Sequence, residues 1–107
     1  MHKPELFDVI ELLIDLPAQN LSSGAQGTIV EAYSNGAYEI EFANDAGETL
    51  ALLPLMATQF VVVWRASSKS WVTLAEKVEA LTAALPEEAL AEVFDFARNT
   101  YIRQMAG

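Results

Sequence analysis

The sequence predicts an α+β fold in which a small antiparallel sheet precedes two helices. Residues 24–65 contain four short apolar runs separated by turns rich in glycine and asparagine, a spacing typical of a sharply bent antiparallel sheet. After residue 72 the period changes, and apolar residues recur at helical spacing. The segment between these regions is small and polar. We therefore expect a sheet unit at 1–65, a linker at 66–72 and a helical hairpin at 73–107.

The first strand is expected over residues 7–15, where β-branched Val9 and Ile10 favour an extended chain. A helix that starts at Pro4 is the competing interpretation, because proline suits a first helical turn. Pro17 ends this run in either case.

The second and third strands are expected over residues 26–33 and 37–43. The alternation of apolar and acidic residues from Tyr38 to Phe42 is typical of a half-buried strand. A three-residue turn with Gly36 in the left-handed region would pair Val30 with Ile40 and Ala32 with Tyr38. That register keeps apolar residues opposite one another.

The fourth strand is expected over residues 49–55 and the fifth over 60–64, with a single helical turn between them. Leu50, Ala51, Leu52 and Leu53 form a continuous apolar run, which predicts cover on both faces of the strand. Five strands with a long first loop and a helical turn before the last make a five-stranded SH3-like antiparallel barrel the simplest topology.

The two helices are expected near residues 73–84 and 86–104. Thr73 and Glu76 form a capping-box pattern, and Pro86 both ends the first helix and opens the second. The apolar stripe of the first helix consists of Leu74, Val78 and Leu81. The stripe of the second helix consists of Leu90, Val93, Phe94, Ala97 and Tyr101, with Phe96 and Ile102 on its flanks.

Residues 71–107 are too few to bury a core of their own, so the helices must pack on the barrel or on another chain. The apolar flanks of the second helix favour a partner surface as well. The candidate interface is Leu90, Val93, Phe94, Phe96, Ala97, Tyr101 and Ile102. A homodimer is the simplest expectation.

Residues 5–65 resemble a family of short uncharacterised bacterial proteins with a predicted SH3-like barrel. The resemblance is carried by residues 8–13, 15–17, 24–31 and 38–42. That family has no established activity, so the resemblance implies a fold and no site. Residues 85–97, which begin Leu-Pro-Glu-Glu, are similar to a segment of small proteins from bacterial toxin–antitoxin loci.

The composition narrows the function class. The formal net charge is −9, which disfavours nucleic acid, because nucleic-acid binding requires cationic side chains. The chain has no cysteine and no long apolar segment, and we expect a cytoplasmic protein without a signal peptide or membrane span. His2 is the only histidine and lies beside the chain end.

No catalytic, cofactor-binding or metal-ligating constellation is predicted. The expected function is therefore a non-catalytic protein-interaction module. The alternative is an antitoxin-like regulator whose C-terminal helix binds a basic toxin.

Overall fold

The computed structural model describes residues 3–106, so His2 lies outside the described residues. The strands are β1 (Val9–Leu12), β2 (Gln26–Ala32), β3 (Ala37–Ala43), β4 (Thr49–Met56), β5 (Phe60–Arg65) and β6 (Ser70–Trp71). Single 3₁₀ turns lie at Pro17–Gln19 and Ala57–Gln59. The helices are α1 (Leu74–Thr82) and α2 (Glu87–Ala106). The predicted α+β class is confirmed.

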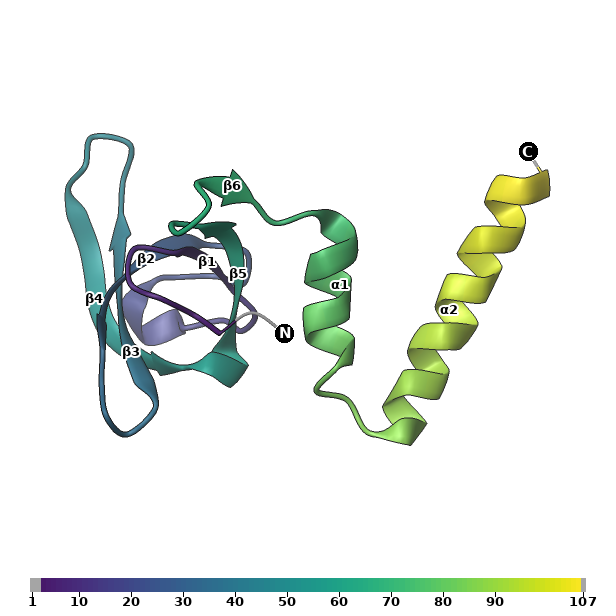
Figure 1. Cartoon of the computed structure of the whole chain (residues 1–107). Helices are drawn as coiled ribbons and strands as arrows, with labels where there is room; N and C mark the ends of the chain where they lie inside the picture. The colour runs from purple at the N-terminus through teal and green to yellow at the C-terminus, as the bar shows by residue number, and fades with distance from the viewer. Residues whose placement is uncertain (1–2, 107) are drawn as a thin grey trace.

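The strands form one antiparallel sheet in the order β4-β3-β2-β1-β5-β6 (Figure 1). The sheet differs from the predicted five-stranded SH3-like antiparallel barrel in two respects. The sheet has six strands, because part of the expected linker turns back so that Trp71 pairs with Trp64 and Ser70 with Arg65. The sheet is also open, since β4 and β6 lie at its two edges and pair with β3 and β5 alone.

The first strand is confirmed but is shorter than the predicted 7–15. A turn precedes it, in which the Asp8 N–H donates to the Glu5 carbonyl at 3.1 Å and Phe7 adopts a φ of 72°. The competing helix from Pro4 does not form. After Leu12 the chain bends, and Asp15 accepts a hydrogen bond from the Ser23 N–H at 2.8 Å.

The β2–β3 hairpin confirms the predicted turn and corrects part of its register. Gly36 has a φ of 89°, and Ala32 lies opposite Tyr38. The predicted pair of Val30 with Ile40 is wrong, because a bulge between Ile29 and Glu31 shifts the register by one residue and places Ile29 opposite Ile40. The bulge directs Ile29 into the core, where it is fully buried.

The expectation that β4 is covered on both faces is also wrong. Leu50 and Leu52 are 60% and 56% exposed, whereas Leu55 is buried. The strand lies at the edge of the sheet, and no other element within residues 3–106 is stacked on its outer face (Figure 1). This uninterrupted apolar run therefore belongs to a strand that has one face in solvent.

The core lies within the curled sheet. Its buried residues are Ile10, Leu12, Ile29, Tyr38, Ile40, Phe42, Leu55 and Phe60. The rings of Tyr38 and Phe60 meet edge to face at 5.8 Å between centroids. Gly27 lies against β3 so closely that a Cβ atom there would stand 2.7 Å from Ile40 Cγ2 and 2.9 Å from Phe42 Cε1.

Asp8 ties the start of the sheet to the segment that follows β5. Its carboxylate is fully buried, and it accepts hydrogen bonds from the N–H groups of Glu5 and Ala66, each at 2.9 Å. Two backbone donors thereby satisfy the buried acceptor, as buried polar groups require. The two donors are separated by almost the whole length of the sheet unit.

The predicted helical hairpin is confirmed. α1 ends at Thr82 and α2 begins at Glu87, so Pro86 separates them as expected. Figure 1 shows α1 beside β5, and α2 beyond it, standing apart from the sheet. The described residues of α2 include no buried side chain.

The N-terminus of α1 allows a first prediction. The Glu76 N–H donates to Thr73 Oγ1 at 3.1 Å, and the Thr73 N–H donates to the Glu76 carboxylate at 3.2 Å. Thr73→Ala is expected to destabilise α1 by about 1 kcal/mol, because the first-turn donors lose their acceptor. Faster amide hydrogen exchange between Lys77 and Thr82 would measure this loss. Thr73→Ser retains the hydroxyl and is expected to exchange like wild type; equal exchange in the alanine variant would contradict the prediction.

Candidate interaction surface on the helical hairpin

The sheet positions α1 through an ion pair and through packing against β5. Arg65 Nη1 of β5 donates to Glu76 Oε2 of α1 at 3.1 Å. α1 contacts β5, and Val61, Val63 and Val72 are buried although they lie outside the main core cluster. α1 is therefore attached to the sheet near its N-terminus.

The contacts of Glu76 at the start of α1 also change its pKa. Hydrogen bonds from the Thr73 backbone and side chain, followed by that from Arg65, hold the pKa of Glu76 below its usual value. A lowered pKa in the folded state means that this carboxylate stabilises the fold above its ordinary pKa. We expect this contribution to be lost only as the pH falls through the lowered value.

The apolar stripe predicted for α1 does not face the sheet. Leu74, Val78 and Leu81 are 75%, 54% and 42% exposed, while Lys77 and Ala80 are half-buried. The helix therefore packs on β5 with a mixed face and presents its apolar stripe to solvent. This arrangement leaves α1 with an apolar face that no other part of residues 3–106 buries.

The structure places most of the predicted interface residues of α2 in solvent. Phe94, Phe96, Tyr101 and Ile102 are exposed large hydrophobic side chains, and Ala97 is also exposed. Leu90 and Val93 are half-buried. We name the exposed large hydrophobic residues of both helices the hairpin apolar surface; they are Leu74, Val78, Leu81, Phe94, Phe96, Tyr101, Ile102 and Met105.

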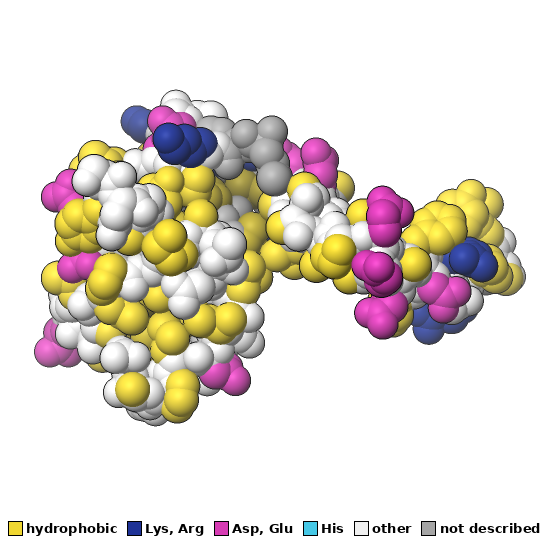
Figure 2. Space-filling model, turned by 90° about the horizontal axis from the view of Figure 1, so that it is seen from below, with side chains coloured by type: hydrophobic (Ala, Val, Ile, Leu, Met, Phe, Trp, Pro, Cys, Tyr) yellow, Lys and Arg dark blue, Asp and Glu magenta, His cyan; other side chains and the backbone are white. Residues whose placement is uncertain are grey.

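Charged side chains lie among these apolar residues. Figure 2 shows hydrophobic, acidic and basic side chains exposed together on the helical extension. The Arg98 guanidinium lies 5.0 Å from the centre of the Phe94 ring, and Arg98 Nη2 lies 3.7 Å from Asp95 Oδ1. The Arg98 side chain is thus held over an exposed aromatic ring on the surface of α2.

A second, smaller exposed region lies where β2 turns into β3. Tyr33 lies close to Glu31 and Glu39, which pair across β2 and β3. Desolvation of its hydroxyl, together with the negative charges of Glu39 and Glu31, raises the pKa of Tyr33. Leu52 of β4 lies opposite Glu41 of β3 on the neighbouring part of the sheet.

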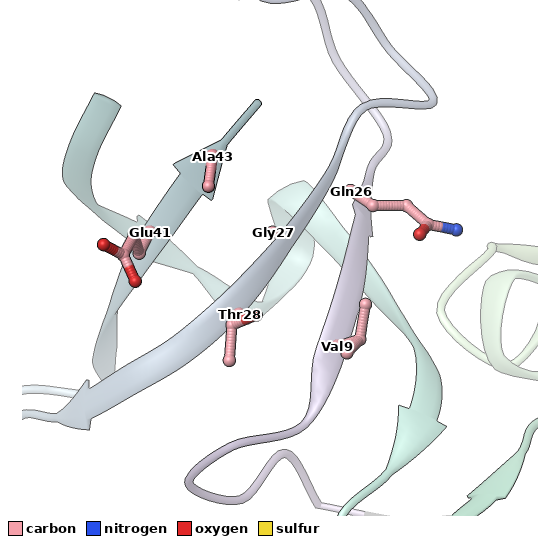
Figure 3. Close-up of a pocket in the computed structure, with 6 residues that line it drawn as sticks. All are labelled: Val9, Gln26, Gly27, Thr28, Glu41 and Ala43. Carbon is pink, nitrogen blue, oxygen red and sulfur yellow. The ribbon is translucent and has the colours of Figure 1, made fainter. Parts of the chain in front are cut away.

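A shallow depression of about 260 Å³ opens on the same sheet (Figure 3). Its lining residues are Val9, Gln26, Gly27, Thr28, Glu41 and Ala43. Glu41 is the one ionisable group among these six, and its carboxylate already accepts a hydrogen bond from the Thr49 hydroxyl at 2.6 Å. These residues do not form an acid–base pair, which needs two titratable groups within reach of one substrate.

Comparison with known protein families decides the family of the sheet unit. A family model described as a domain of unknown function, DUF4926, matches residues 6–62, more than half of the chain. The chain belongs to the DUF4926 family. The expected membership of an uncharacterised family is thereby confirmed for the segment that bears the resemblance. No curated protein and no solved structure matches the chain.

The DUF4926 segment ends within β5 and does not include the hairpin. The hairpin apolar surface therefore lies outside the part of the chain that the family defines. Sequence reasoning found seven of its eight members on the two helices but missed Met105, although Met105 continues the stripe four residues after Tyr101. It also missed the exposed face of β4.

Two further observations concern residues 3–106. This part of the chain brings together no group of three or more His, Cys, Asp or Glu side chains suited to a metal ion. Neither of its helices combines the length and apolar character needed to cross a bilayer.

Proposed function

We propose that this protein is a non-catalytic protein-interaction module, in which an SH3-like barrel carries a helical hairpin that associates with a second copy of the chain. The observation that carries the proposal is the hairpin apolar surface, to which α2 contributes Phe94, Phe96, Tyr101, Ile102 and Met105. Large exposed apolar patches on proteins mark interaction sites.

The free energy expected from burial of these apolar side chains is large enough for a stable complex. Full burial of one large apolar side chain contributes about 1.5–3 kcal/mol. Association costs about 4–15 kcal/mol in lost freedom of motion. Burial of several such side chains on each of two chains therefore offsets this cost.

The topology supports the barrel in this proposal. The strands β4-β3-β2-β1-β5 follow one another so that the first strand lies between the second and the fifth, and a 3₁₀ turn precedes β5. These features agree with an SH3-like arrangement, to which β6 adds a short edge strand. The proposal takes the protein as cytoplasmic, in keeping with its lack of cysteine, and as acting without nucleic acid, in keeping with its net charge of −9.

Tyr101→Asp tests the self-association. Tyr101 is 66% exposed, so a charge at this position leaves the core of the sheet unaffected and penalises burial at an interface. Light scattering at high micromolar concentration is expected to give a dimer for wild type and a monomer for Tyr101→Asp, with unchanged tryptophan fluorescence. Gln19→Glu adds the same charge at an exposed position outside the helical hairpin and is expected to remain dimeric. A monomeric wild type would contradict the proposal.

An antitoxin-like regulator is the second candidate. It is favoured by the acidic first turns of α2, where Glu87, Glu88 and Glu92 are exposed, because a basic partner protein would complement them. A monomeric wild type that binds a cationic amphipathic peptide through α2 would favour this candidate over self-association.

A further inference from the structure

The charges of α2 are segregated along its length. The part up to residue 95 carries Glu87, Glu88, Glu92 and Asp95 and has no basic residue. The remainder carries Arg98 and Arg103 and has no acidic residue. Each of these side chains is exposed. The helix therefore has an acidic N-terminal half and a basic C-terminal half.

A stripe of side chains joins the two halves. Residues spaced three and four apart lie on one face of a helix, and this spacing connects Glu87, Ala91, Phe94, Arg98, Tyr101 and Met105. The contact of Arg98 with the Phe94 ring places the guanidinium on this stripe. The stripe thus begins with the acidic Glu87 and the small Ala91, has Phe94 and Arg98 at its centre, and ends with Tyr101 and Met105.

We propose that α2 packs antiparallel against α2 of a second copy, along this stripe and about a two-fold axis near residue 96. The inference rests on the proposed self-association and adds its geometry. An antiparallel pair places the acidic half of each helix beside the basic half of the other, whereas a parallel pair places acids beside acids. The helix dipoles also oppose each other only in the antiparallel pair.

The central positions of the stripe match one another in this arrangement. With the axis near residue 96, Ala91 of one copy lies opposite Tyr101 of the other, so a small side chain faces a large one. Phe94 of each copy lies opposite Arg98 of the other, where a guanidinium can approach the ring face. Apolar burial supplies the affinity, and the charges select the direction.

Single-cysteine variants test the direction, because the natural chain has no cysteine. Ala91→Cys and Tyr101→Cys are prepared separately, mixed and oxidised with a glutathione buffer. A disulfide requires Cα atoms within about 7 Å, and ten helical residues span about 15 Å. The antiparallel pair is expected to give the mixed disulfide and little of either self-linked product. A parallel pair would give self-linked products and little of the mixed one.

A charge variant provides a second measurement that does not depend on cysteine. Arg98→Glu/Arg103→Glu is expected to weaken the dimer at least tenfold at low salt, and less at high salt, because each acidic half then faces another acidic half. The matched control, Lys3→Glu/Lys69→Glu, changes the net charge equally at exposed positions outside α2 and is expected to leave the dimer unchanged.

The outcomes separate the two proposals. A dimeric wild type with self-linked cysteine variants, or with equal amounts of all three disulfides, overturns the antiparallel geometry and leaves self-association intact. A dimer that Arg98→Glu/Arg103→Glu does not weaken also overturns the geometry. A monomeric wild type overturns both proposals.

Discussion

Asp8→Ala is expected to lower the free energy of unfolding by about 3 kcal/mol, because a buried donor left without its acceptor costs about 1–3 kcal/mol. Two backbone N–H groups, those of Glu5 and Ala66, lose their acceptor in this variant. The Asp8 side chain is also fully buried, so its removal leaves a void between the first turn and the end of β5. Urea unfolding monitored by the fluorescence of Trp64 and Trp71 would measure the change.

Asp45→Ala is the matched control for this prediction. Asp45 lies exposed in the loop between β3 and β4, and surface substitutions of this kind change stability by no more than about 0.5 kcal/mol. An Asp8→Ala variant with the urea midpoint of the Asp45→Ala variant would show that the buried carboxylate does not stabilise the sheet.

Gly27→Ala is expected to destabilise the protein by about 2 kcal/mol through crowding. The added methyl group would stand within 3.0 Å of Ile40, Phe42 and the Glu41 carbonyl oxygen. Gly27 does not have a left-handed backbone angle, so alanine introduces no backbone strain there. Without the crowding, the substitution would stabilise the fold by about 0.4–1 kcal/mol, because it lowers the conformational entropy of the unfolded chain. A lower free energy of unfolding in the variant would therefore show that the crowding outweighs the entropic gain.

A double-mutant cycle gives the control for Gly27. Ile40→Ala removes the nearest methyl group and makes room for the new one, so Gly27→Ala/Ile40→Ala is expected to be more stable than the sum of the two single effects. Chemical denaturation of the four proteins measures this coupling. A Gly27→Ala variant as stable as wild type would contradict the prediction.

Most of the sheet could be predicted from local sequence patterns. The features that were predicted wrongly or missed depend on contacts between residues far apart in the chain. The alternation in β3 and the turn at Gly36 identify the central hairpin from neighbouring residues alone. The bulge at Val30 was not predictable, because it depends on which side of β2 the core lies. The two-residue strand β6 was also missed, since its pairing with Trp64 and Arg65 leaves no periodicity in so short a segment.

The helical hairpin was also predictable where local patterns decide the structure, and not where tertiary contacts decide it. Helical spacing identified the apolar stripes of both helices, and Pro86 placed the break between them. The spacing could not show that Leu74, Val78 and Leu81 face solvent, because this depends on how α1 packs against β5, where Glu76 pairs with Arg65. Periodicity identifies an apolar face, but only the tertiary contacts decide what it meets.

The hydrogen bond from the Ala66 N–H to Asp8 also bears on where the autonomous folding unit ends. The DUF4926 segment stops at residue 62, yet the buried carboxylate inside it is completed by a donor four residues further along the chain. A chain cut at the family boundary would lose that donor, the end of β5 and the whole of β6. The shortest piece that retains all three extends to about residue 72, so the evolutionary unit is smaller than the physical one.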